Sequence, residues 1–340
     1  MKQAVMTAPR QIEFRELPKP AAGKGMLLLR ISRIGVCGSD IHVYHGKHPY
    51  TKYPVVQGHE VSGYVEQAGE GVVGFAPGDL VTIMPQVVCG TCYPCRTGQY
   101  NICESLKVMG FQTTGAASEY FAVDADKCLK LPAGVGPDEA AMIEPLSVAV
   151  HAVSRAGDVA GKSIVVYGAG PIGNLVAQAA RGLGAARVLI TDTSDHRLGV
   201  ASASGIAHRV NPAREDLGKR LSEVFGADGA DLAFECVGIE ATMSQAVALA
   251  RKGSLIVVVG VFGEKPRVDL GLVQDRELSL VGTLMYREAD YRLAIELALS
   301  KVIALEPLMS AHFPFDRYLD AYRFIEESKD KSMKVFIDLS

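Results

Sequence analysis

A glycine-rich segment constrains the fold of this chain more than any other feature of its sequence. Residues 168–173 read Gly-Ala-Gly-Pro-Ile-Gly, between an apolar run at 164–167 and a stretch with helical spacing. Glycines at this spacing allow a tight turn, close approach of a pyrophosphate to the backbone, and close packing of helix on strand. The start of the helix adds free N–H groups that bind anions. The predicted dinucleotide contacts are Gly168, Gly170, Pro171, Ile172 and Gly173.

A carboxylate further along the chain indicates which dinucleotide is bound. Asp192 ends the next apolar strand, about twenty residues downstream, where an acidic side chain binds the adenosine ribose hydroxyls. Because this carboxylate repels a 2′-phosphate, we predict NAD rather than NADP. Arg197 leaves NADP as an alternative cofactor, since its side chain either stacks on the adenine or accommodates the 2′-phosphate. In the alternative interpretation the glycines form an ordinary turn and Asp192 caps a helix.

The residues around this segment predict an α/β domain. From residue 163 onward, apolar strands alternate with helical stretches, which is typical of a doubly wound parallel sheet. The predicted strands are 164–166, 188–190, 230–234 and 255–259, and the predicted helices begin at 171, 195 and 240.

The first part of the chain predicts a second domain of another class. Short strands separated by glycine and proline are typical of an antiparallel, barrel-like β domain, and they lie at 26–31, 61–65, 80–83 and 117–123. A helical stretch at 139–155 marks the boundary between the domains. Helices at 289–299 and 315–325 and a strand at 334–337 do not continue the alternation, so we expect this segment to return to the first domain.

Composition excludes several classes of partner. The formal net charge is -3 and the basic residues are scattered, so a nucleic-acid interface or a basic membrane-binding face is not expected. The chain has no apolar run of eighteen residues and no signal-peptide pattern at its N-terminus, which predicts a soluble, cytoplasmic protein. A small-molecule substrate fits this composition.

Four of the seven cysteines lie on one short segment and predict a metal site. They are Cys89, Cys92, Cys95 and Cys103, in a lobe at about 85–106. Four thiolates with no open position describe a tetrahedral structural zinc site, which folds a lobe of low apolar content. An iron–sulfur cluster and four free thiols are the alternatives.

Several motifs in one order give the chain a family resemblance. Taken singly, Cys37 is interpreted as a buried small residue and His59 as a core histidine. The motifs are Cys37-Gly38-Ser39-Asp40, Gly58-His59-Glu60, the four-cysteine lobe, Glu144-Pro145 and 168–173. Together they resemble the zinc-containing medium-chain dehydrogenases, and the branch with polyol (sorbitol) and threonine dehydrogenases most. The resemblance implies a GroES-like catalytic domain at 1–147 and 288–340 and a Rossmann NAD-binding domain at 148–287.

The resemblance also implies residue roles. Cys37 and His59 would bind a catalytic zinc, with Glu60 and Glu144 as the carboxylates that complete its coordination or exchange within it. Asp40 would fix the tautomer of His59. The implied proton carriers are Ser39 and then His42, whereas His45 and His48 are expected to be exposed loop histidines.

The implied activity is NAD-dependent oxidation of a secondary alcohol (EC 1.1.1.-) with two zinc ions per chain, one catalytic and one structural, in a homodimer or homotetramer. Met285 stands where polyol dehydrogenases carry an arginine, although Tyr286 keeps its place and Arg287 follows. Residues 44–50 are expected to line a cleft for a polyol, a sugar acid or threonine. The alternatives are a threonine 3-dehydrogenase, a zinc-independent NADPH reductase, and a non-catalytic nucleotide- or redox-sensing zinc protein.

Overall fold

The computed structural model describes residues 1–339, which divide into two compact units. Unit 1 comprises residues 1–144 and 309–339, and unit 2 comprises residues 145–308. The return to unit 1 therefore comes later than the expected residue 288. The helix α9 (Glu288–Leu299) stays with unit 2, because its buried Asp290 binds His151 Nδ1 at 2.8 Å.

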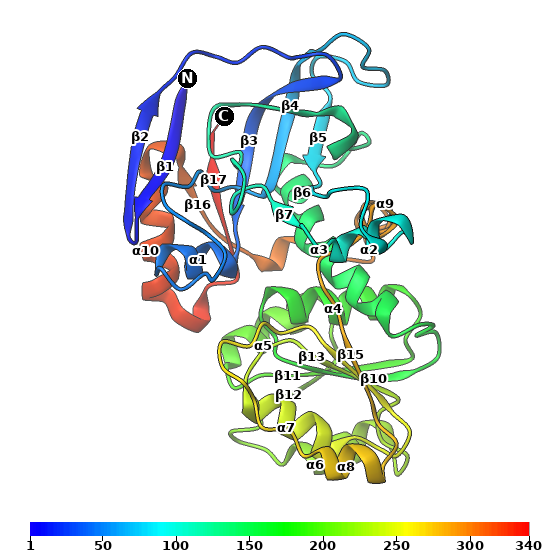
Figure 1. Cartoon of the computed structure of the whole chain (residues 1–340). Helices are drawn as coiled ribbons and strands as arrows, with labels where there is room; N and C mark the ends of the chain where they lie inside the picture. Colours follow the sequence, from blue (N-terminus) through cyan, green and yellow to red (C-terminus); the bar gives the residue numbers. More distant parts are fainter. Residues whose placement is uncertain (340) are drawn as a thin grey trace. The chain divides into compact units, whose positions relative to one another are not determined.

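A parallel sheet forms the centre of unit 2 (Figure 1). Its strands are β10 (Ser163–Tyr167), β11 (Arg187–Thr191), β12 (His208–Val210), β13 (Leu232–Glu235), β14 (Leu255–Val258) and β15 (Ser279–Gly282). The order is β12-β11-β10-β13-β14-β15, so the chain reverses direction across the sheet between β10 and β13. Every residue of β10 is buried, as expected for a strand covered on both faces. Ligands of such sheets bind beyond the carboxyl ends of the strands at this reversal.

Helices follow the strands of unit 2, and those predicted to begin at 171, 195 and 240 are present. They are α4 (Pro171–Gly182), α5 (Asp195–Ala203), α6 (Leu217–Phe225), α7 (Glu240–Leu249), α8 (Leu270–Asp275) and α9, followed by the 3-10 turn η3 (Glu306–Leu308). Pro171 occupies the first position of α4, where its missing N–H has no helical partner to lose. The longer helix α3 (Pro137–Arg155) begins in unit 1 and ends in unit 2.

Unit 1 contains a mixed, mainly antiparallel sheet with the order β16-β17-β3-β4-β5-β9, and β8 also pairs with β3. Its strands are β3 (Met26–Val36), β4 (Glu60–Ala68), β5 (Leu80–Ile83), β8 (Tyr120–Asp124), β9 (Cys128–Lys130), β16 (Met309–Pro314) and β17 (Lys334–Asp338). Smaller pairs are formed by β1 (Lys2–Ala8) with β2 (Gln11–Glu16) and by β6 (Gln86–Val87) with β7 (Lys107–Val108).

The helical elements of unit 1 besides the start of α3 are short. They are α1 (Gly38–Tyr44), α2 (Tyr93–Arg96), α10 (Tyr318–Ser328), and the 3-10 turns η1 (Tyr100–Ile102), η2 (Ala125–Lys127), η4 (Phe315–Arg317) and η5 (Lys329–Lys331). The C-terminal strand β17 pairs antiparallel with β3, with Phe336 opposite Gly35, and Figure 1 shows it in red beside the blue β3. This pairing brings the last residues of the chain next to the segment that carries Cys37.

Candidate active site

Cys37 lies at the junction of β3 and α1, within unit 1. The strand ends at Val36 and the helix begins at Gly38, so Cys37 is the extended residue that precedes the first turn. Asp40 closes this junction, because its Oδ2 accepts the Cys37 N–H at 2.9 Å while its own N–H donates to the Cys37 carbonyl at 3.0 Å. The half-buried thiol therefore projects from a fixed turn.

His59 and Glu60 lie at the start of β4, next to β3 in the sheet. Gly58 before them has a φ of 96°, and a Cβ there would lie 3.0 Å from the Ala117 nitrogen, so the position favours glycine. In the pairing of β3 with β4, Glu60 lies opposite Gly35, and Gly35 is two residues before Cys37 in the chain. As a result, one potential ligand atom from each of Cys37, His59 and Glu60 lies within 4.8 Å of the other two.

These three side chains fit a catalytic zinc by their chemistry. A thiolate, an imidazole nitrogen and a carboxylate oxygen are the ligand types of zinc sites that keep a position for water or substrate. Burial disfavours a charged imidazole at His59, but the nearby Asp40 and Cys37 outweigh it and raise the pKa of His59 well above its usual value. Surroundings that favour a proton on this ring also favour a bound metal cation.

Asp40 faces the side of His59 that a metal would not use. Its Oδ1 lies 3.6 Å from His59 Nδ1, which leaves Nε2 as the nitrogen available to a metal. Both side chains are buried, and His59 Nδ1 has no hydrogen-bond partner among residues 1–339, because 3.6 Å is longer than a hydrogen bond. Burial also raises the pKa of Asp40, although His59 and the Cys37 N–H oppose that effect.

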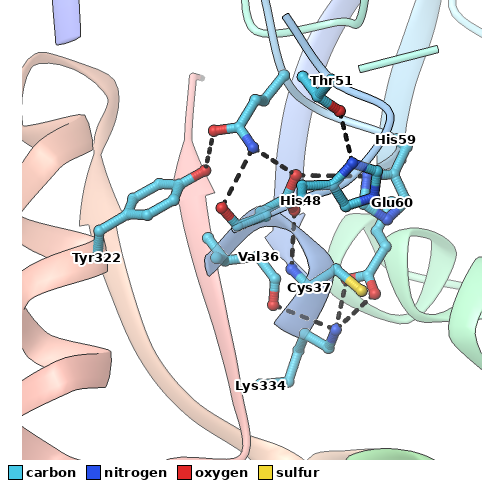
Figure 2. Close-up of polar contacts among 10 residues, drawn as sticks. Val36, Cys37, His48, Thr51, His59, Glu60, Tyr322 and Lys334 are labelled. Carbon is cyan, nitrogen blue, oxygen red and sulfur yellow. Dashed lines mark hydrogen bonds and ion pairs between the residues drawn. The ribbon is translucent and has the colours of Figure 1, made fainter. Parts of the chain in front are cut away.

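Two further buried residues lie behind Asp40. Gln57 Nε2 donates to Asp40 Oδ1 at 2.9 Å, and Gln57 Oε1 accepts from the hydroxyl of Tyr322 at 2.8 Å. Figure 2 shows Tyr322 approaching from α10, on the far side of this network from His59. A polar chain thus extends from His59 through Asp40 and Gln57 to the C-terminal helix of unit 1.

Glu60 binds a buried lysine from the C-terminal strand. Lys334 Nζ lies 2.7 Å and 2.5 Å from the two carboxylate oxygens of Glu60 and donates to the Val36 carbonyl at 3.3 Å (Figure 2). Burial disfavours the ammonium group, but Glu60 and then Cys37 outweigh it, and the pKa of Lys334 is raised. Glu60 is therefore both close to the candidate metal ligands and held by a cation.

Glu144 is buried on α3, close enough to act electrostatically on the same cluster. Its carboxylate contributes to the raised pKa values of His59 and Lys334. The close group of potential ligand atoms contains Glu60 and not Glu144. In this arrangement Glu60 is the nearer carboxylate of the two expected from the sequence.

Helix α1 and the loop after it carry the residues expected to move a proton. Ser39 is half-buried in the first turn and His42 is exposed near the end of the helix. The expectation that His45 and His48 are exposed is wrong. His45 Nε2 lies 2.6 Å from Glu326 Oε1 on α10, and His48 stacks on Phe111 at 4.9 Å between ring centroids and contacts the Thr51 hydroxyl at 2.8 Å.

The four cysteines of the lobe converge as expected for one metal ion. Cys103 Sγ lies 3.5 Å from the sulfur of Cys89 and 3.8 Å from that of Cys92, and the sulfurs of Cys89 and Cys95 are 4.0 Å apart. Tetrahedral zinc with Zn–S bonds of about 2.3 Å requires sulfurs about 3.8 Å apart. Hydrogen bonds from the Thr91 and Cys92 backbone lower the pKa of Cys89 to about 6, which favours a thiolate.

The glycine-rich turn lies between β10 and α4 in unit 2. Gly168 has a φ of 97°, and a Cβ at Gly173 would lie 1.9 Å from the Gly168 carbonyl oxygen, so both positions require glycine. A Cβ at Gly170 would meet no atom within 4 Å. The side of the turn at Gly170 is therefore open to a ligand, which fits a dinucleotide pyrophosphate.

Asp192 and Arg197 lie beside this turn. Asp192 accepts the backbone N–H groups of Ala169 and Ser194, each at 2.8 Å, so its carboxylate ties the end of β11 to the glycine turn. Arg197 Nη1 is 3.9 Å from Asp192 Oδ2. Tyr286, which keeps its place in the polyol-dehydrogenase pattern, is buried in unit 2 against Tyr291, with ring centroids 4.9 Å apart.

Sequence reasoning missed Lys334, Gln57 and Tyr322. The signal for Lys334 was a lysine that begins the otherwise apolar run Lys-Val-Phe-Ile at the C-terminus. Gln57 directly precedes Gly58-His59, but nothing in the sequence indicates that its amide meets a phenol from α10. Their partners depend on the pairing of distant strands and helices.

Two family models match this chain. The alcohol dehydrogenase GroES-like domain matches residues 23–133, and the zinc-binding dehydrogenase domain matches residues 171–300. The chain therefore belongs to the zinc-binding dehydrogenases, a family of oxidoreductases. The expected combination of a GroES-like domain and a Rossmann-type parallel sheet is confirmed.

Named relatives extend over most of the chain. It is 40% identical to 2-dehydro-3-deoxy-L-galactonate 5-dehydrogenase of Pseudoalteromonas atlantica, over 87% of this chain and 86% of that protein. It is 35% identical to a sorbitol dehydrogenase of Halalkalibacterium halodurans, over 93% and 92%. The crystal structure of an E. coli CFT073 alcohol dehydrogenase with NADH has a TM-score of 0.92 and 31% identity, covering 99% of each chain. The expected polyol-dehydrogenase branch is thus confirmed.

No helix among residues 1–339 is both long and apolar enough to cross a bilayer.

Proposed function

We propose that this protein oxidises a secondary alcohol of a hydroxylated acid or polyol with NAD, releasing ketone, NADH and a proton. The observation that carries the proposal is the convergence of ligand atoms from Cys37, His59 and Glu60 within 4.8 Å. The sugar-acid and sorbitol dehydrogenases among the relatives support the same reaction.

Residues of unit 1 would bind the zinc ion, orient its imidazole ligand and carry the proton in this reaction. A zinc ion held by Cys37 and His59 would lower the pKa of a bound alcohol. Asp40 faces Nδ1 of the imidazole at 3.6 Å and leaves Nε2 free to bind, and this carboxylate would favour the ring orientation that presents Nε2. Ser39, half-buried two residues after Cys37, accepts the alcohol proton, and the exposed His42 passes it to water.

A cavity in unit 1 favours an acidic substrate. It has a volume of about 520 Å³, and Phe111 in its wall also contacts His59, with ring centroids 4.8 Å apart. The charged residues of the wall are Arg15 and Lys52, and neither forms an ion pair within residues 1–339. Two free cations and no carboxylate suit the carboxylate end of a sugar acid better than a neutral polyol or the zwitterion threonine.

NAD is the proposed cofactor because Asp192 lies beside the open glycine turn. A carboxylate at this place would repel the 2′-phosphate of NADP. We further propose a second, structural zinc on the four cysteines, and a cytoplasmic homodimer or homotetramer. Metal analysis of the purified protein with two zinc ions per chain, and light scattering, test these two statements.

One experiment separates this function from its alternatives. NAD reduction is measured on matched aldonates and alditols, on threonine and on simple secondary alcohols, before and after chelation. We expect chelator-sensitive turnover, fastest on an aldonate. Turnover that survives removal of both metals would identify a zinc-independent reductase, fastest turnover of threonine a threonine dehydrogenase, and NAD binding with no turnover a sensing protein.

A further inference from the structure

We propose that Gln57 and Tyr322 are positioning residues for the metal-binding imidazole of His59, acting through Asp40. The inference rests on the proposed zinc-dependent function and assigns a role to the C-terminal helix α10. It gives that helix a part in metal binding, although it contributes no ligand.

The hydrogen bonds accepted by the two carboxylate oxygens of Asp40 show that Gln57 fixes the oxygen that faces His59. Oδ2 accepts the Cys37 N–H at 2.9 Å, and Oδ1 accepts Gln57 Nε2 at 2.9 Å while lying 3.6 Å from His59 Nδ1. Each oxygen thus has one bond that fixes it, and the bond from Gln57 holds the oxygen that faces the imidazole. Without Gln57, the carboxylate would be held at one oxygen and free to rotate away from His59.

Tyr322 holds the end of the Gln57 amide that faces away from Asp40, while the carboxylate, which only accepts, selects the amide nitrogen. The hydroxyl of Tyr322, which Figure 2 labels, donates to Gln57 Oε1 at 2.8 Å, and Gln57 Nε2 donates to Asp40 Oδ1 at 2.9 Å. A flipped amide would direct its oxygen at a carboxylate oxygen, and both atoms are acceptors. Tyr322 cannot easily move, because its ring packs on Tyr318 and Tyr44, with centroids 5.7 Å and 5.2 Å away.

Burial makes these two bonds necessary. Asp40, Gln57 and Tyr322 have only 1%, 2% and 1% of their surface exposed, so water cannot replace a lost partner. A carboxylate buried in this way needs every donor that the fold supplies. The pair therefore acts on the metal through the orientation of Asp40 and hence of His59.

Metal release from the full-length protein tests the inference. Gln57→Met keeps the volume of the side chain and removes both bonds, whereas Tyr322→Phe removes only the bond that holds the amide oxygen of Gln57. Release of zinc to a chromophoric chelator is followed, and each site is identified by cobalt substitution, since a four-thiolate site and a mixed site absorb differently. We expect release from the Cys37–His59 site to be about tenfold faster in Gln57→Met and about threefold faster in Tyr322→Phe.

The four-cysteine lobe is a control within the same molecule, and its release rate should stay unchanged. Gln178→Met is the matched variant, because Gln178 is a fully buried glutamine of unit 2 that binds Asn174 and Ala304. If Gln57→Met releases both metals faster, or no faster than Gln178→Met, the positioning role is refuted. If the wild-type protein holds no metal on Cys37 and His59, the proposed function fails instead.

Discussion

Glu60 and Lys334 are ionic groups with almost no contact with water, since their side chains are 2% and 4% exposed. Three adjacent strands bring them together: β4 carries Glu60, β3 leads to Cys37, and β17 carries Lys334. Gly35 makes room for the carboxylate, because a Cβ there would lie 2.4 Å from Glu60 Oε2. A buried charge beside the proposed metal site is thus balanced by a residue almost three hundred positions away.

Removing the lysine should leave an uncompensated buried carboxylate. We expect Lys334→Met to lower the free energy of unfolding by about 3–5 kcal/mol, measured by urea denaturation. The double variant Glu60→Gln/Lys334→Met should recover most of this loss. Lys130→Met, which removes a half-exposed partner of Asp79, should cost no more than about 1 kcal/mol. Equal losses for the two lysine variants would contradict the importance of burial.

Two glycines of the dinucleotide turn allow a matched comparison. Gly173→Ala should destabilise the protein by about 1–3 kcal/mol, because its Cβ would overlap the Gly168 carbonyl. Gly170→Ala should leave the melting temperature almost unchanged, because its Cβ meets no atom, yet weaken NADH binding by about tenfold or more. Fluorescence titration with NADH checks the second effect. Unchanged affinity in a stable Gly170→Ala variant would place the pyrophosphate elsewhere.

Among the helices and strands, the sequence pattern predicts those that are determined by residues close together in the chain. The strand β10 and helix α4 follow from an apolar run, a glycine turn and helical spacing. The hairpin β1–β2 was not predicted, because β2 is almost wholly exposed and has no apolar alternation. The strand expected at 117–123 begins at Tyr120, because Ser118 forms an isolated bridge to Gln3 instead.

The candidate site divides in the same way. The four cysteines form a short motif whose chemistry is readable in the sequence, whereas Cys37, His59 and Glu60 were predicted as metal ligands only through the family resemblance. Lys334 and Tyr322 act through pairings between elements far apart in the chain, which no local pattern contains. The place where the chain returns to unit 1 likewise depends on tertiary contacts, among them the one between His151 on α3 and Asp290 on α9.

This contact predicts how the stability of unit 2 depends on pH. Burial opposes ionisation of Asp290, but the His151 hydrogen bond and the Arg287 N–H outweigh it and lower the pKa of Asp290. The charged carboxylate therefore stabilises the fold above its unfolded pKa of about 3.9, and the contribution disappears as the pH falls through the lower folded value. Asp290→Asn should cost about 1–3 kcal/mol at pH 6, and this difference should shrink below pH 4 in urea titrations. A difference that is constant between pH 6 and pH 3 would contradict the assignment.

At the scale of the whole molecule, charge limits how an acidic substrate is recognised. The chain has 35 basic and 38 acidic side chains, so its overall field does not attract an anion. In the proposed function attraction would be local, and the unpaired Arg15 and Lys52 on the cavity wall would provide it. Many other cations of unit 1 are neutralised, as Lys2 is by Asp316 and Lys19 by Glu66.

Neutralising these two cations should therefore change substrate preference without changing the chemistry. We expect Arg15→Gln/Lys52→Gln to raise the KM for an aldonate by about 10- to 100-fold, which is equivalent to about 1.4–2.8 kcal/mol for the two exposed charged contacts together. The kcat, and both constants for the matched alditol, should stay within about twofold, because no atom near Cys37 or His59 changes. Lys24→Gln/Lys252→Gln removes two charges from exposed pairs with Glu70 and Asp275 and controls for net charge. An equal rise in KM for aldonate and alditol would show that the cavity wall binds hydroxyl groups rather than the carboxylate.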